Sequence, residues 1–159
     1  MAVNNFYNIL IDGIKTILLA DPWISANIGT DAIYAYDKGN PRELFPCIEI
    51  ALAQDIPDYD VQRYHHKPII HLLPQQRILN KELLYKGDAT TIGLYEITDY
   101  IMDCVTKKSN LKLADNCLQM ILKGIYFNGG IFESELSGKS RFLAFSDIVL
   151  QVEKIRYMD

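Results

Sequence analysis

The feature that most constrains the fold is a repeated change in the spacing of apolar residues. Between residues 4 and 20 they recur every three or four positions, and this spacing returns between 91 and 107. It is typical of amphipathic helices. Between residues 45 and 54, and again between 141 and 157, apolar and polar residues alternate, as in strands with one buried face. The sequence therefore predicts both helices and strands.

Local signals add boundaries to these elements. Asn4 or Asn5 is a suitable N-cap for the first helix, and Asp21-Pro22 is expected to end it. Thr90 or Thr91 is the expected N-cap of the second helix. Further strands are predicted where apolar runs are followed by turn residues. These runs are 32–36, 61–73, which Pro74 is expected to end, and 117–127. For residues 75–90, the sequence leaves open a short helix or a strand.

The resulting order is α-β-β-β-α-β-β. The simplest packing is an α+β fold, in which a largely antiparallel sheet of four or five strands carries both helices on one face. We expect residues 1–159 to form one domain, because a chain of this length buries enough surface for a core of its own. The region around 55–90 is too long for a compact hairpin, so it is expected to contain a projecting segment or insertion.

Composition excludes several classes of protein. The formal net charge is −4 and the pI is about 5.3, whereas a nonspecific nucleic-acid binder is strongly basic. No apolar run approaches the roughly 20 residues of a membrane span, and the first residues lack the pattern of a secretory signal, so a cytoplasmic product is expected. Three separated cysteines, Cys47, Cys104 and Cys117, form neither a disulfide framework nor a zinc motif. We interpret them as reduced, mostly buried thiols.

Candidate catalytic and ligand motifs are weak. Ser137-Gly-Lys-Ser140 resembles the end of a phosphate-binding loop, but such a loop needs glycine at position 133, where the chain has Glu133, and a helix afterwards. His65 and His66 point to opposite faces of a strand, and His71 would lie roughly 20 Å from His65 on the same face. The three are therefore not expected to share a metal ion, and we interpret them as solvated. No nucleophile elbow or dinucleotide fingerprint occurs. We therefore expect no enzyme activity, no metal and no cofactor.

The positive signals favour an assembly component. Long polar segments leave the strands at 55–60 and 128–140, and segments of this kind often serve subunit contacts. The chain also contains ten tyrosines, a residue enriched in interfaces because it combines an apolar ring with a polar tip.

Three patterns resemble the bacteriophage tail terminator or tail-completion proteins. After the first helix come Ile33-Tyr-Ala-Tyr-Asp37 and Phe45-Pro-Cys-Ile-Glu-Ile50, similar to the strand, proline-marked turn and second strand of that family. A helix of about four turns, 91–107, then separates the third and fourth strands. Gly124-Ile-Tyr-Phe-Asn-Gly-Gly130 and Arg141-Phe-Leu-Ala-Phe-Ser-Asp-Ile-Val-Leu150 resemble its closing hairpin. The resemblance covers nearly the whole chain in element order, with 75–90 as an insertion.

This resemblance implies a structural virion protein located in the tail or neck and made in the host cytoplasm. It implies a ring, hexameric in the family, that caps the tail tube, stops its elongation and joins it to the head. The implied partners are other copies of the chain, the tail tube protein, possibly a sheath, and neck or head-completion proteins. DNA would pass through the lumen without specific binding. Neither a membrane nor a cofactor is implied.

Two sets of charged residues are expected to take part in this assembly. Opposite charges at the closing-hairpin tip are suited to pair with a neighbouring subunit, and acidic residues after the second strand are candidates for the lumen wall, although an ordinary solvated loop also explains them. The interface set is Glu133, Glu135, Lys139 and Arg141, and the lumen set is Asp55, Asp58 and Asp60. The alternatives are a head-completion or head–tail connector subunit, a small cytosolic enzyme, and a scaffold or regulatory domain.

Overall fold

The protein has an α+β fold, which confirms the predicted fold class. The computed structural model describes residues 5–35, 44–60, 62–128, 131–134 and 140–157. Within them, eight strands join one largely antiparallel sheet, more than the four or five expected. In chain order, the elements are α1 (Phe6–Ala20), α2 (Pro22–Asn27), η1 (Thr30–Ala32), β1 (Ile33–Ala35), β2 (Cys47–Gln54), β3 (Asp58–Tyr59), β4 (Arg63–His66), β5 (Ile69–Ile78), α3 (Leu83–Lys86), α4 (Leu94–Thr106), η3 (Lys108–Asn110), β6 (Gln119–Phe127), β7 (Ile131–Ser134) and β8 (Ser140–Tyr157).

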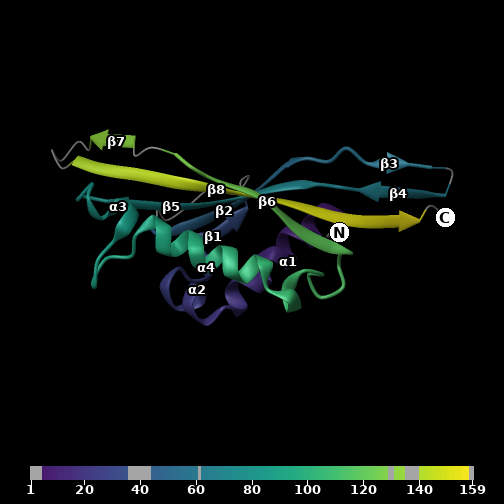
Figure 1. The fold of residues 1–159 in the computed structure, drawn as a ribbon, viewed down its shortest axis with the longest axis horizontal. Coiled ribbons are helices and arrows are strands. Elements are labelled where there is room, and N and C mark those ends of the chain that lie inside the picture. Colours follow the sequence, from purple (N-terminus) through teal and green to yellow (C-terminus); the bar gives the residue numbers. More distant parts are fainter. Residues whose placement is uncertain (1–4, 36–43, 61, 129–130, 135–139, 158–159) are drawn as a thin grey trace.

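Strand β8 is the axis of the sheet. It contains 18 residues, which corresponds to about 60 Å of extended chain. Along one edge it pairs with β5 and then with β4, and along the other it pairs with β7 and then with β6, always antiparallel. Beyond β5 the sheet continues through antiparallel β2 to β1, which is parallel to β2. In Figure 1, β8 runs past α1, α2 and α4 at both of its ends.

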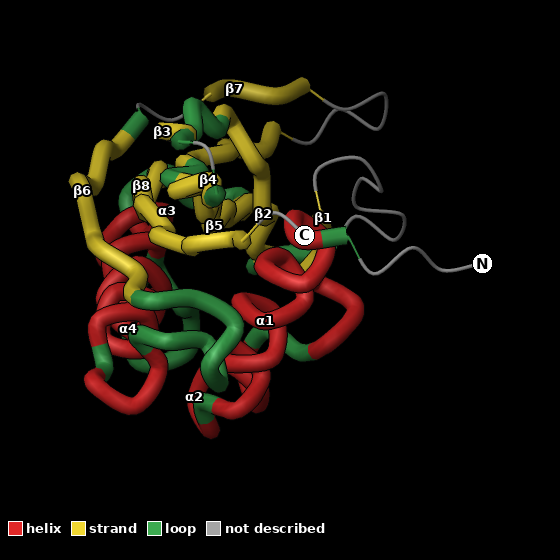
Figure 2. The backbone as a smooth tube through the Cα atoms, turned by 90° about the vertical axis from the view of Figure 1, so that its right-hand side faces the viewer, coloured by secondary structure: helices red, strands yellow, loops and turns green. Residues whose placement is uncertain are grey.

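The helices cover one face of this sheet, as predicted. Figures 1 and 2 show α1, α2 and α4 together on one side of the strands. The alternation predicted for 141–157 is confirmed, because alternate side chains of β8 are at most 1% exposed. They are Ala144, Ser146, Ile148, Leu150 and Val152. The last three share a core with Leu10, Ile14 and Leu18 of α1, Ile97 and Ile101 of α4, and Ile48 and Ile50 of β2.

The two ends of α1 follow the local signals in the sequence. Asn5 is the N-cap, and its side chain accepts a hydrogen bond from the Asn8 amide at 2.8 Å. The helix ends before Asp21, as predicted. The sequence analysis did not predict α2, which Asp21 caps by accepting hydrogen bonds from the Trp23 and Ile24 amides. Trp23 then stacks on Tyr100 of α4, with ring centroids 4.0 Å apart.

The start of α4 differs from the prediction. Its N-cap is Gly93, and neither Thr90 nor Thr91 is the cap. Both threonine amides instead donate to the Asp88 carboxylate at 2.8 Å, which closes a turn before the helix. The backbones of Gly87 and Gly93 cross in close contact at this turn, and Gly87 has a φ of 65°. Side-chain-to-backbone hydrogen bonding of this kind competes with helix formation and therefore shortens the predicted helix at its start.

The segment that the sequence left open, 75–90, divides between strand and helix. Strand β5 does not end at Pro74 as predicted but continues to Ile78. Its register with β8 omits Leu73 and Pro74, the place where proline has no N–H to donate. α3 follows, and Leu84 packs there with Leu94 and Ala144 in a second, smaller core.

A three-stranded ribbon leaves the body of the molecule beside the start of α1 (Figure 1). We call this ribbon the arm. It consists of β3, β4 and residues 154–157 of β8, and its register pairs Tyr59 with Tyr64 and His66 with Lys154. The region expected to project, 55–90, is therefore split, since 58–66 lies in the arm while β5 lies in the main sheet. At the opposite end of β8, β7 pairs with residues 140–143, a pair that we call the β7 end.

The crossing of Gly87 and Gly93 gives a stability prediction. A β-carbon at position 93 would overlap the backbone nitrogen of Gly87 and the carbonyl oxygen of Tyr85. We expect Gly93→Ala to lower the free energy of unfolding by about 2–3 kcal/mol through overpacking. Urea denaturation followed by the fluorescence of Trp23, the single tryptophan, measures this.

Gly13→Ala is the matched control. A β-carbon there meets Leu113 Cβ at an ordinary 3.7 Å, within a helix that alanine favours. This variant should gain about 0.5–1 kcal/mol. Equal stability of the two variants would contradict the assigned crossing.

Candidate functional site

Two of the four predicted interface residues lie at the β7 end. Glu133 in β7 and Arg141 in β8 occupy directly opposite register positions. Glu135 and Lys139 lie outside the described residues. The role of this set in subunit contacts stays a prediction.

Two of the three predicted lumen residues are exposed on the arm and already hold partners. The Asp58 carboxylate accepts a hydrogen bond from Lys67 Nζ at 2.7 Å, and Asp60 pairs with Arg63 Nε at 2.9 Å. The contact with Lys67 lowers the pKa of Asp58. Backbone hydrogen bonding by Gln62, followed by the Arg63 contact, lowers the pKa of Asp60. The arm therefore presents paired charges rather than an acidic surface.

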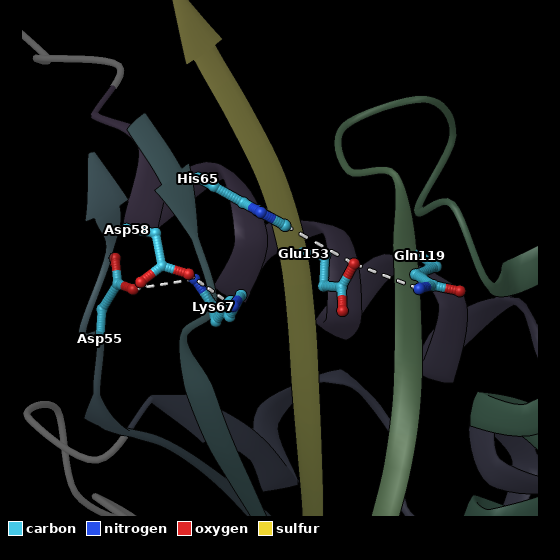
Figure 3. A network of polar contacts seen from close by, with 6 residues as sticks. All are labelled: Asp55, Asp58, His65, Lys67, Gln119 and Glu153. Atoms are coloured by element: carbon cyan, nitrogen blue, oxygen red, sulfur yellow. Dashed lines mark hydrogen bonds and ion pairs between the residues drawn. The ribbon is translucent and has the colours of Figure 1, made fainter. Parts of the chain in front are cut away.

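The third lumen residue, Asp55, is not a solvated loop residue. Its side chain is only 4% exposed, because it lies where α1, the end of β2 and the base of the arm meet. The carboxylate accepts hydrogen bonds from Tyr7 Oη at 2.7 Å and from the Lys67 amide at 3.0 Å, and it lies 2.6 Å from His66 Nδ1. Figure 3 shows Asp55 and Asp58 next to one another, on the same side of Lys67. We call Tyr7, Asp55 and His66 the junction cluster.

The interpretation of the histidines as solvated was wrong for His66, whose side chain is buried beside the Asp55 carboxylate. His65 and His71 are partly exposed, and each also lies beside a carboxylate. His66 is 6% exposed and faces Asp55, whereas His65 Nε2 lies 3.7 Å from Glu153, which also accepts from Gln119 (Figure 3). His71 Nδ1 lies 2.6 Å from the Asp147 carboxylate. The carboxylates come from other strands or loops, so no local sequence signal indicates these pairs. Among the described residues, no group of histidine, cysteine, aspartate or glutamate is arranged to hold a metal ion.

The face of the sheet opposite the helices is a second candidate surface. Its central residues are only half-buried and include Leu73, Phe145 and Val149, with the His71–Asp147 pair among them. Beside this pair, Gln75 Nε2 donates to the Glu49 carboxylate at 2.9 Å, and burial raises the pKa of Glu49. Apolar side chains interspersed with internally paired polar groups are typical of protein–protein contacts.

An exposed aromatic cluster lies between α3, α4 and the end of β6. The rings of Tyr95 and Phe127 meet edge to face at 5.2 Å, and Tyr85 lies 5.5 Å from Tyr95. Tyr95 and Phe127 are 48% and 49% exposed, and Tyr85 Oη donates to the Asn128 carbonyl. The number of tyrosines suggested such a surface, but the sequence could not locate it, because its members lie 32 to 42 positions from Phe127.

The three cysteines are Cys47, Cys104 and Cys117. All three thiols are free and buried, as the sequence indicated. Burial raises the pKa of the Cys104 and Cys117 thiols to about 11, which opposes formation of the reactive thiolate. Their Sγ atoms donate to the carbonyls of Ile17 and Leu111 at 3.3 and 3.6 Å. The described part of the chain has no helix long and apolar enough to cross a membrane.

The raised thiol pKa values predict a loss of stability at alkaline pH. The protonated thiols contribute their full stability below the ordinary pKa of 9.0, and this contribution is lost as the pH rises through about 11. We expect each thiol to account for about 2 kcal/mol of the fall in unfolding free energy between about pH 8 and pH 11. Urea denaturation across this range measures the fall.

A variant with both Cys104→Ala and Cys117→Ala provides the comparison. Its stability should decline less steeply over the same range, since the remaining decline reflects tyrosines such as Tyr34, whose pKa burial also raises. Identical slopes for the two proteins would contradict the assignment.

Comparison with known proteins leaves the family open. No protein-family model matches the chain, and no curated protein matches its sequence. Among solved structures, a chain of the "Virion of native gene transfer agent (GTA) particle" is similar, with 13% sequence identity and a TM-score of 0.37. The match covers 94% of this chain and 97% of that chain. A TM-score of this size does not establish a common fold or a common role.

Proposed function

We propose that this chain is a non-enzymatic structural subunit of a phage-like virion, and that copies of it form a ring at the end of the tail tube. The sequence patterns that resemble tail terminator proteins are the source of this proposal. The observation that carries it furthest is the form of the sheet, because β8 extends past α1, α2 and α4 at both ends. One subunit therefore presents strands for contact at two opposite ends.

The two ends differ in composition, which favours a head-to-tail arrangement. The arm exposes Tyr59 beside its paired charges, at 70%, and the connection that leads into it exposes Ile56, at 72%. The other end carries the aromatic cluster and the β7–β8 pair. A contact between unlike surfaces of identical subunits generates a ring if the rotation closes and a filament if it does not. We propose that this contact closes, with six subunits as in the family that the sequence resembles.

Such a ring covers the growing end of the tube with a surface to which further tube subunits do not bind. Its tube-facing side binds the last turn of tube subunits, whereas its opposite side lacks the surface that the tube repeats. Elongation therefore stops, and the free side meets the head or neck. DNA passes through the lumen. A wall that attracts phosphate only weakly favours this passage, because it does not hold the DNA in place. Asp58 and Asp60 stay candidates for the lumen wall, but their pairing with Lys67 and Arg63 makes that wall closer to neutral than acidic.

Electron microscopy of the purified protein tests this proposal. We expect negative-stain images over a concentration series, alone and with purified tail tubes, to contain sixfold rings or tube ends capped by rings. Stacks or long tubes would instead favour a tube subunit. Subunits that remain separate and bind filled heads but not tail tubes would favour the head-completion alternative.

Charge reversal at the β7 end tests the predicted subunit contact. In a variant with Lys139→Glu and Arg141→Glu, we expect ring formation to be lost while thermal unfolding and circular dichroism stay close to wild type. Lys108→Glu with Lys112→Glu is a matched control, because it makes the same change in net charge at exposed positions beyond α4. Rings that persist in the first variant would remove these residues from the contact.

A further inference from the structure

The connection between the arm and the body is interrupted in two of its three strands. β2 ends at Gln54, after a shift of register between Leu52 and Gln54, and β3 begins only at Asp58. β4 and β5 are separated by Lys67 and Pro68. Strand β8 alone continues through the junction, where the Val152 amide donates to the Pro68 carbonyl at 3.0 Å. Two of the three strands therefore have a place to bend.

The junction cluster lies at this interruption. Asp55 belongs to the first connection, the Lys67 amide to the second, and Tyr7 to the first turn of α1. A single buried carboxylate therefore joins both connections to the helical layer through contacts of 2.7 and 3.0 Å. A buried carboxylate without these donors would be costly, so the contacts form together or are lost together.

Aromatic packing adds to the same contact. The Phe6 ring lies 4.8 Å from the His66 ring, and Tyr7 meets His66 edge to face at 6.4 Å. On the arm, Tyr64 lies 5.9 Å from His66, and the Arg156 guanidinium lies 5.9 Å from the Phe6 ring centroid. The first turn of α1 therefore touches side chains of both β4 and β8.

One atom of the cluster has no partner. His66 Nε2 is buried and makes no hydrogen bond, although Nδ1 of the same ring faces Asp55. A buried, unsatisfied polar atom costs free energy, which offsets part of what the other contacts contribute. The unpartnered nitrogen therefore lowers the net stability that the cluster contributes.

We propose that the junction cluster is a latch that sets the angle of the arm, and that the arm turns as a unit about the connections at 55–57 and 67–68 when the latch opens. The internal pairing of β3, β4 and the end of β8 is preserved in this motion. The contacts of Asp55 with Tyr7 and the Lys67 amide are exchanged for water or for groups of a partner. This inference does not depend on ring formation, because it concerns the subunit alone.

Amide hydrogen exchange resolved by NMR in the whole 18.2 kDa chain tests the latch. In Tyr7→Phe, which removes one donor to Asp55 and keeps the ring, we expect exchange of the Lys67 and Val152 amides to become at least tenfold faster. Amides within the arm and within α4 and β6 should keep their wild-type rates. Tyr100→Phe, on the helical layer, is the matched control and should change none of these rates.

Three results would overturn the proposal. Unchanged rates at Lys67 and Val152 would show that Tyr7 does not hold the junction. Faster exchange in the arm alone would indicate local unfolding of the ribbon, and equal acceleration in arm and body would indicate a general loss of stability.

A distance measurement provides an independent readout of the motion. Spin labels at Gln62→Cys in the arm and Ser109→Cys beyond α4 lie at exposed positions, and the native cysteines are buried. We expect pulsed electron resonance to give a broader or shifted distance distribution in Tyr7→Phe than in the otherwise identical labelled protein. Coincident distributions would exclude rotation of the arm, whatever the exchange rates.

Discussion

The continuous pairing of β8 is the constraint on which the rest of the structure depends. A strand of 18 residues has backbone donors and acceptors along its whole length, and four different strands satisfy them from its two sides. Its middle also supplies Ile148, Leu150 and Val152 to the core that receives α1 and α4. The same strand therefore contributes to the core at its centre and carries both projecting ends. The positions of the two ends relative to the core consequently depend on this one strand.

This arrangement places polar chemistry where the strand pairing is interrupted. Between β4 and β5 the strand is interrupted at Lys67 and Pro68, and the backbone groups there need partners from elsewhere. Asp55 supplies one for the Lys67 amide, and Tyr7 and His66 surround the same carboxylate. A buried network of this kind contributes little net stability compared with apolar packing, but it defines one relative position of two parts. The network lies between the arm and α1, where apolar residues could also have filled the space. Its role in defining the relative position of these two parts explains why polar residues are found there.

The sequence predicted elements whose signals are local and missed contacts that are not. Alternation in 141–157 gave the inward face of β8, and Asn5 and Asp21-Pro22 gave the ends of α1, because these depend on neighbouring residues. The start of α4 was misplaced because Asp88 binds the threonine amides that looked like a cap. Asp55 and His66 were interpreted as solvated since their burial depends on Tyr7, 48 positions from Asp55. The aromatic cluster likewise joins residues from three separate elements, so no spacing rule could have found it.

The unlikeness of the two ends bears directly on how copies of this chain would associate. An isologous dimer would join one end to itself and leave the other end of each subunit exposed. Head-to-tail contact uses both ends of every subunit, so the exposed Ile56 and Tyr59 of one copy and the aromatic cluster of the next would both leave water. In the head-to-tail ring that we propose, closure depends on the rotation between neighbouring subunits, which would follow from the angle of the arm. On this proposal, a change at the Asp55 junction would alter the curvature of the assembly.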